Sequence, residues 1–152
     1  MFTLVPSQFF NPASAREALA EVADIQEGDV VEHLEIPQYD AVLVYTVDGD
    51  SDVEGKPGIY QLLMQLQDCP EYNKILCSIA GDRLFIVIAQ GKSLLLAGSY
   101  PVRDFITAEY YIFLSVSSLQ LNPEISTICW RTPLTDEEEL SMYRYFKSVV
   151  YL

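Results

Sequence analysis

The chain has 152 residues, of which half are hydrophobic and 12% are aromatic, so it holds ample material for a packed core and is not a mainly disordered chain. Nine basic residues stand against 22 acidic ones, which gives a net charge of −13 at pH 7. A field of that sign repels phosphate backbones and anionic lipid, so nucleic acids and membrane surfaces are poor partners.

The first part of the chain predicts a small module of strand, helix, strand and strand, which we assign to residues 1–50. Residues 2–5 are β-prone. Asn11 and Pro12 provide an N-cap followed by proline at the first helical position, and apolar residues at helical spacing continue to Ile25 before Gly28 ends the helix. Strands are expected at 30–36 and 41–47, and the second of these is continuously apolar.

Residues 51–152 predict a second unit, with one compact unit for the whole chain as the alternative. Pro57 opens a helix that closes before Pro70. Three strand candidates follow at 74–79, 84–89 and 94–100, and the Gly-Asp and Gly-Lys pairs between them are typical of hairpin turns. The strand at 84–89 is apolar on both faces, so we expect it at the centre of the sheet with cover on each side.

The remaining residues predict a helix, a strand and a helix. Asp104 caps a long helix through Leu119, and its two apolar stripes imply burial on more than one side. The stripes of this helix are Phe105, Ile112, Val116 and Leu119 on one side and Ile106, Tyr110 and Phe113 on the other. A strand is expected after the helix, at 125–130.

The last helix is predicted to begin at a capping box formed by Thr135 and Glu138. The acidic run 137–139 in its first turn complements the helix dipole, which is a commoner role for such neighbours than catalysis or metal binding. The side chains expected to face inward from this helix are Leu140, Tyr143, Phe146 and Val150.

Two further groups resemble chemical sites and have simpler explanations. Asp48, Asp50 and Asp52 are spaced as in a calcium-binding loop, but Val53 stands where such a loop needs its turn glycine, so a solvated acidic loop is preferred. His33 is the only histidine and lacks the neighbours of a hydrolase or zinc site. No catalytic, cofactor or metal site is predicted.

The three cysteines are Cys69, Cys77 and Cys129. Their number is odd and no two form a C-x-x-C pair, so neither a disulfide framework nor a thiolate metal site is indicated. We expect buried thiols that act as small hydrophobic side chains. No apolar run approaches the ~20 residues of a membrane-spanning helix, and the start lacks a basic signal-peptide region, so a cytoplasmic location without membrane insertion is expected.

Several segments carry a resemblance that covers nearly the whole chain. From Lys74 onward, the order of three antiparallel strands, helix, strand and helix resembles the ribonuclease-H-like half-domain from which actin-like ATPases are built. The preceding module resembles the small inserted module of cell-division and pilus-assembly members of that superfamily. The segments are Phe2-Thr-Leu-Val-Pro6, Asp40-Ala-Val-Leu-Val-Tyr45, Tyr72-Asn-Lys-Ile75, Asp104-Phe-Ile-Thr-Ala-Glu-Tyr110 and Leu121-Asn-Pro-Glu124.

On these segments the chain resembles a Bacteroidetes family known as a domain of unknown function with an actin-like fold. The resemblance implies an α/β fold with a mixed sheet, in which a ribonuclease-H-like half-domain of actin-like type follows a small strand-helix-strand-strand module. It also implies a further N-terminal half that this chain lacks.

The chain departs from the nucleotide-binding pattern that this resemblance implies. Actin-like ATPases place an Asp and a glycine-rich turn at the first hairpin, where backbone amides cradle phosphate, but the segment 77–82 here has one glycine and no acid on the strand. Their Gly-Gly turn after the fourth strand is replaced by the segment 131–134. A nuclease of this fold needs a carboxylate on the first strand, which offers only Cys77 and Ser78, although Glu109 fills the helix position.

The sequence therefore predicts a non-catalytic protein-interaction or scaffold protein with a degenerate actin-like fold and no cofactor. The alternative is a nucleotide-sensing or weak ATPase protein that needs a second chain to complete its cleft. Aromatic residues beyond the core-facing stripes of the last two helices are the expected interface, namely Tyr111, Tyr145 and Tyr151. The expected partner is another protein or a second copy in a homodimer, bound through residues 71–152. That segment carries only −2 of the charge (7 − 9), against −11 (2 − 13) for residues 1–70.

Overall fold

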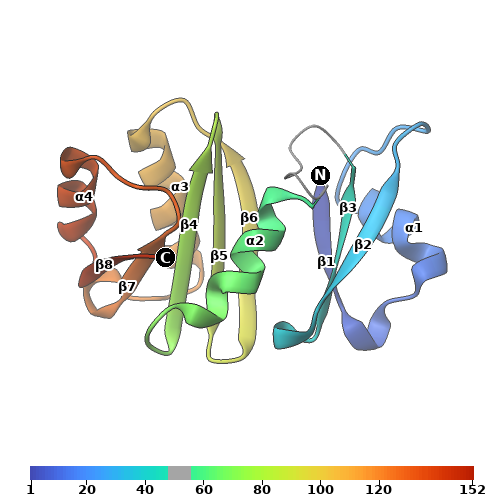
Figure 1. Cartoon of the computed structure of the whole chain (residues 1–152), viewed down its shortest axis with the longest axis horizontal. Helices are drawn as coiled ribbons and strands as arrows, with labels where there is room; N and C mark the ends of the chain where they lie inside the picture. The colour runs from blue at the N-terminus through green and yellow to red at the C-terminus, as the bar shows by residue number, and fades with distance from the viewer. Residues whose placement is uncertain (48–55) are drawn as a thin grey trace. The chain divides into compact units, whose positions relative to one another are not determined.

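A computed structural model describes residues 1–47 and 56–152 (Figure 1). Its chain forms two compact units, Met1–Met64 and Gln65–Leu152, which are called the N-terminal and C-terminal units below. Each unit has its own sheet, so the fold is α/β, as predicted. The predicted module boundary at residue 50 and the acidic loop with Asp48, Asp50 and Asp52 lie outside the described residues.

The N-terminal unit is a three-stranded antiparallel sheet with a short helix. The strands β1 (Phe2–Pro6), β2 (Val31–Ile36) and β3 (Ala41–Thr46) have the order β1-β3-β2. All six residues of β3 are buried, which explains why this continuously apolar strand takes the central place. The predicted order of strand, helix, strand and strand is confirmed.

The helix of this unit, α1 (Ala15–Ala20), is shorter than predicted. Its Leu19 packs with Val42 and Val44 in the core, whereas Val22, expected on the apolar stripe, is 65% exposed. The guanidinium of Arg16 donates to the backbone oxygens of Gln26 and Asp29, and these bonds hold the next segment as a turn instead of more helix.

The helix α2 (Gly58–Gln65) begins directly after Pro57, as predicted, and buries Ile59, Leu62 and Leu63. A 3₁₀ turn at Leu66–Asp68 follows and packs on the sheet of the C-terminal unit. The other 3₁₀ turns are Ser7–Phe9, Pro12–Ser14, Pro37–Tyr39 and Pro123–Ile125.

The C-terminal unit has a five-stranded sheet with the order β6-β5-β4-β7-β8. Its strands are β4 (Asn73–Ala80), β5 (Arg83–Gln90), β6 (Ser93–Pro101), β7 (Thr127–Trp130) and β8 (Ser148–Tyr151). The first three form an antiparallel meander, with Gly81 and Gly91 in the left-handed region at φ of +59° and +57°. The strand β7 pairs in parallel with β4, and β8 pairs in parallel with β7.

The prediction that residues 84–89 form the central strand is wrong in one respect. The strand β5 is flanked by the two hairpin strands, as expected, but the centre of the five is β4. The meander uses both edges of β5 and leaves one edge of β4 and one edge of β6 free, and the later strand β7 pairs with β4. The interior position of β5 still accounts for its apolar sequence, because Ile86, Val87 and Ile88 are fully buried.

The prediction of a last helix running to Val150 is also wrong. The helix α4 (Asp136–Tyr143) stops early, and the Ser-Val-Val-Tyr segment forms β8. β-branched and aromatic residues favour a strand when an open edge is available, and β7 offers one. Of the residues expected to face inward, Leu140 and Tyr143 are 59% and 49% exposed, Val150 is half-buried, and Phe146 is buried together with Met142.

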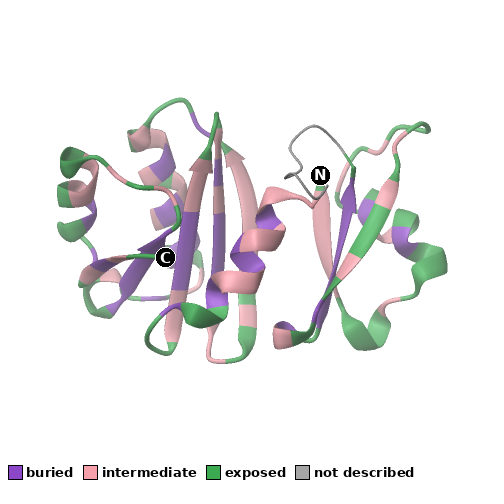
Figure 2. Ribbon diagram, viewed as in Figure 1, coloured by how far each residue is buried: buried purple, intermediate pink, exposed green. Residues whose placement is uncertain are grey.

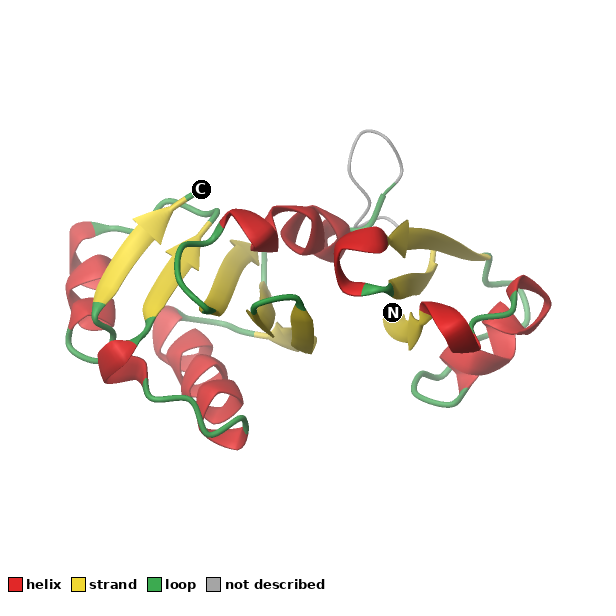
Figure 3. Cartoon of the chain, turned by 90° about the horizontal axis from the view of Figure 1, so that it is seen from below, coloured by secondary structure: helices red, strands yellow, loops and turns green. Residues whose placement is uncertain are grey.

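The helices α3 (Phe105–Ser118) and α4 lie on the same side of the C-terminal sheet (Figure 3). Their buried side chains meet the strands in one core, and Figure 2 shows the burial concentrated on the strands and on the inner faces of the helices. The core residues include Ile75, Ile86, Ile88, Ala108, Ile112, Val116, Trp130, Met142 and Phe146.

Replacing Ile86 with Asp is expected to unfold the C-terminal unit. Ile86 is 0% exposed, and an unpaired buried charge costs several kcal/mol against a total stability of about 5–15 kcal/mol. Thermal unfolding followed by circular dichroism measures the loss. Ile125→Asp is the control, because Ile125 is 64% exposed and should tolerate the charge. A soluble Ile86→Asp chain that melts at the parental temperature would contradict the burial of β5.

Candidate protein-interaction surface

The helix α3 is positioned by a cap that the sequence predicts. The Asp104 carboxylate accepts hydrogen bonds from the backbone N–H and the hydroxyl of Thr107, both at 2.7 Å. These two bonds hold the pKa of Asp104 below its usual value. The residue thus supplies the N-cap, and its negative charge lies at the positive end of the helix dipole.

The inner face of α3 is packed, but its outer face is apolar as well. Ala108, Ile112, Ser115 and Val116 are buried. On the opposite side, Ile106, Tyr110 and Leu114 are 77%, 61% and 51% exposed, and their spacing of four residues places them in one row along the helix. We call these three residues the α3 stripe. The expectation that both apolar sides of this helix are buried within the chain is therefore wrong for Ile106 and Tyr110.

Almost all residues of the same helix around the α3 stripe are uncharged. Glu109 is the single charged residue of α3, and its carboxylate accepts a hydrogen bond from the Ser141 hydroxyl of α4. The remaining exposed positions of the helix are Ser117 and Ser118. In a chain with net charge −13, none of the exposed residues of this helix is charged.

The three predicted interface tyrosines each pack against a different neighbour. Tyr111 is half-buried and stacks on Tyr100 with ring centroids 4.7 Å apart. Tyr145 is 45% exposed and contacts Phe113 edge-on at 4.6 Å. Tyr151 is 44% exposed and donates to the Glu139 carboxylate at 3.1 Å, and partial burial together with this bond raises the pKa of Tyr151.

Tyr111 also contacts the α3 stripe. Its ring meets that of Tyr110 edge-on, with centroids 5.4 Å apart. Tyr100 on β6, Tyr111 and Tyr110 therefore form a row of aromatic rings that leads from the sheet to the helix surface. This contact restricts the rotation of Tyr110, which sequence reasoning placed on a buried stripe.

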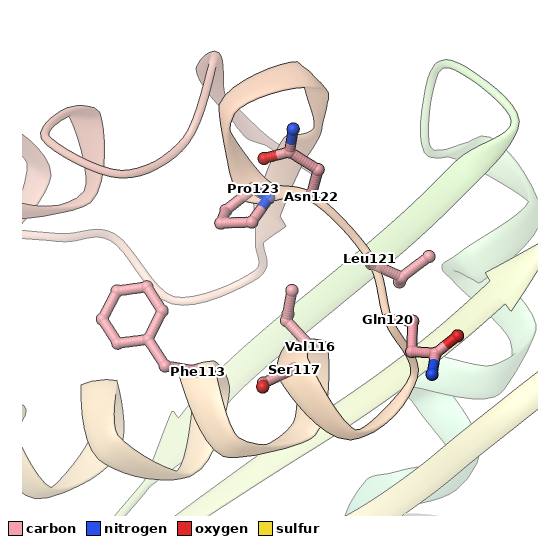
Figure 4. Close-up of a pocket in the computed structure, with 7 residues that line it drawn as sticks. All are labelled: Phe113, Val116, Ser117, Gln120, Leu121, Asn122 and Pro123. Carbon is pink, nitrogen blue, oxygen red and sulfur yellow. The ribbon is translucent and has the colours of Figure 1, made fainter.

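An open pocket lies where α3 ends (Figure 4). Helix termination produces it, because Gln120 adopts a left-handed φ of 58° and turns the chain toward Pro123. The side-chain oxygen of Asn122 accepts a hydrogen bond from the Glu124 N–H at 3.0 Å. The pocket is lined by Phe113, Val116, Ser117, Gln120, Leu121, Asn122 and Pro123, with no charged residue among them.

The other residues that the sequence offered as candidate sites lie at ordinary positions in helices and strands. His33 lies exposed on β2 with its ring 4.8 Å from that of Phe10. The predicted capping box is confirmed, because Glu138 accepts from the Thr135 N–H at 2.9 Å and Thr135 accepts from the Glu138 N–H at 3.2 Å. Within residues 1–47 and 56–152, no group of three or more His, Cys, Asp or Glu residues could hold a metal ion.

All three cysteines are buried and free, as the sequence predicts. Sequence spacing did not indicate that two of them meet. A hydrogen bond between the thiols of Cys69 and Cys129 raises the pKa of Cys69 and lowers that of Cys129. Burial raises the pKa of Cys77.

The carboxyl ends of the parallel strands β4 and β7 are tied together by their own polar groups. The Thr132 hydroxyl accepts from the Ile79 N–H at 2.8 Å and donates to the Ile79 oxygen at 3.2 Å. It also lies 3.1 Å from the Ser78 hydroxyl, and the Arg131 N–H donates to the Cys77 oxygen at 3.0 Å. These contacts satisfy backbone groups at the strand ends.

Comparison with known proteins identifies the family of this chain. Residues 57–149, more than half of the chain, match the family described as a protein of unknown function (DUF3822). The chain belongs to this family. No curated protein matches it.

The fold of this DUF3822 chain is similar to that of a solved structure. A protein from Bacteroides thetaiotaomicron, described as having an actin-like ATPase fold and unknown function, is similar with a TM-score of 0.77 and 18% identity. The similarity covers 99% of this chain and 64% of that one, so the chain spans about two thirds of the longer protein. The resemblance to an actin-like fold is thus confirmed.

None of the helices in the described part of this DUF3822 chain has the length and apolar character needed to cross a bilayer.

Replacing Thr132 with Val is expected to destabilise the chain by about 1–3 kcal/mol, because the Ile79 N–H and oxygen lose their shared partner in a half-buried position. Urea denaturation of the purified chain measures the change. Thr132→Ser keeps the hydroxyl and should retain most of the stability. A Val variant that loses no more stability than the Ser variant would contradict the role of the hydroxyl, because Val keeps the methyl group of threonine and lacks only the hydroxyl.

Proposed function

We propose that this DUF3822 chain is a non-catalytic interaction protein that binds a protein partner through the α3 stripe. The observation that carries the proposal is the outer face of α3, which exposes Ile106, Tyr110 and Leu114 and has no charge among its exposed residues. Surface helices of soluble proteins usually place charged or polar residues on the side away from the core. An apolar row in that position is typical of a surface that is covered in the working assembly.

The composition of the stripe fits an interface. Tyrosine is enriched among the residues that dominate binding energy, and here Tyr110 lies at the middle of the row. Its ring is supported by Tyr111, so less side-chain freedom is lost when a partner binds. Tyr145 and Tyr151 remain exposed aromatic positions that we include in the wider interface.

The strand ends support a role without nucleotide chemistry. In the actin-like ATPases that the chain resembles, backbone amides at the first hairpin cradle phosphate. Here the Ile79 N–H already donates to the Thr132 hydroxyl, which also occupies the Ile79 oxygen. A shared fold does not establish a shared function, so the function of this chain is inferred from its site and not from its fold.

The alternative is a nucleotide-sensing or weak ATPase protein whose cleft is completed by a second chain. The observation that favours it is the length of the Bacteroides thetaiotaomicron protein, of which this chain spans 64%. A second chain, similar in size to the part of that protein that this chain does not cover, would then supply the missing side of the cleft.

A thermal-shift screen of the full chain with ATP, ADP and Mg²⁺ separates the two functions. The interaction protein should show no shift. A nucleotide present at 100 times its dissociation constant would add about 2.7 kcal/mol of stability, which raises the melting temperature by several degrees. A saturable shift with any of these nucleotides overturns the proposal in favour of the alternative.

A further inference from the structure

We infer that the partner bound by the α3 stripe is a second copy of this chain, and that the two α3 helices pack antiparallel about a two-fold axis beside Tyr110. This inference rests on the proposed function, since it names the occupant of the same surface. It depends on three features of the stripe: its spacing, its lack of charge and its helical ridge.

The spacing of the stripe is self-complementary. Ile106 and Leu114 lie four residues before and four residues after Tyr110. When two copies of such a helix run antiparallel about a two-fold axis at the middle residue, the first position of one copy lies beside the last position of the other. Ile106 then contacts Leu114 of the second copy, and Tyr110 lies beside its own copy. A two-fold interface requires this kind of self-matching surface.

Charge selects a second copy over a basic partner. Two chains of net charge −13 repel each other, so identical copies can meet closely only through a face without charge. The exposed residues of α3 form such a face, because none of them is charged, and Glu109, the single carboxylate of the helix, is half-buried and hydrogen-bonded to Ser141. A basic partner would gain nothing from this face, whereas the exposed carboxylates of the N-terminal unit, such as Glu32 and Glu35, would attract it.

The geometry of helix packing agrees with this arrangement. A row of side chains four residues apart is the ridge that packs into the groove of a neighbouring helix in the commonest crossing class, at about −50°. Antiparallel α3 helices also place the positive end of each helix dipole near the negative end of the other. One 14-residue helix from each copy makes a small interface. Such an interface is at the low end of specific complexes, so the dimer should dissociate on dilution.

The first experiment measures the mass of the full chain by size exclusion with light scattering over a dilution series. We expect a mass near 34 kDa, twice 17.2 kDa, at high concentration, and 17.2 kDa at low concentration. Tyr110→Lys should raise the dissociation constant at least about 30-fold, because it places two ammonium groups side by side at the axis. Tyr72→Lys is the matched control, since Tyr72 is 67% exposed and lies outside α3.

The second experiment tests the antiparallel register with two complementary charge variants. Ile106→Lys and Leu114→Glu should each be monomeric at concentrations where the parent is a dimer. An equimolar mixture should recover the dimeric mass, because Lys at 106 of one variant meets Glu at 114 of the other while the remaining Leu114 and Ile106 keep their contact. Circular dichroism confirms that each variant is folded, as the exposure of these side chains leads us to expect.

Three results overturn the inference: a parent chain that is monomeric at every concentration, a dimer that Tyr110→Lys leaves intact, and a mixture that stays monomeric. The last would indicate a parallel or unrelated contact. If the parent chain is monomeric, the α3 stripe is instead a binding surface for a different protein or for another part of a longer chain. None of these results bears on nucleotide binding, so failure of the dimer is distinguishable from failure of the proposed function, which the thermal-shift screen decides.

Discussion

The parallel pairing of β7 with β4 is the interaction on which the C-terminal unit depends. The meander uses both edges of β5 and leaves one edge of β4 and one edge of β6 free, and β7 takes the edge of β4. A parallel strand can reach that edge only by a crossover, and the crossover here is α3. The pairing therefore fixes α3 across one face of the sheet. It also leaves the outer edge of β7 open, which β8 then occupies.

The position of α3 explains why one side of it is left exposed. Ala108, Ile112 and Val116 lie on the inner face of the helix and pack against the sheet in the core. The opposite row is too far round the helix to reach the sheet, and α4 contacts α3 through the polar pair Glu109 and Ser141. No element among the described residues buries Ile106 or Tyr110, so their apolar character is unexplained by the packing of the chain itself.

Local patterns allowed most of the fold to be predicted, and edge competition limited the rest. The caps at Asp104 and Thr135 and the glycine turns depend on a few adjacent residues, so they could be read directly from the sequence. The central place of β4 and the strand β8 depend on which edge is free in the assembled sheet. The candidate surface was predicted only as a type, aromatic residues on the last two helices, because an exposed and a buried stripe have the same periodicity.

The ends of the strands β4 and β7 are held together by a side chain of the chain itself. Backbone groups at the carboxyl ends of parallel strands need partners, which a bound phosphate supplies when a nucleotide is present. Thr132 provides such partners from within the chain, since one hydroxyl both accepts from and donates to Ile79. The backbone N–H and oxygen of Ile79 are therefore paired within the chain. The core likewise needs only the inner face of α3, which leaves Ile106, Tyr110 and Leu114 on the surface of that helix.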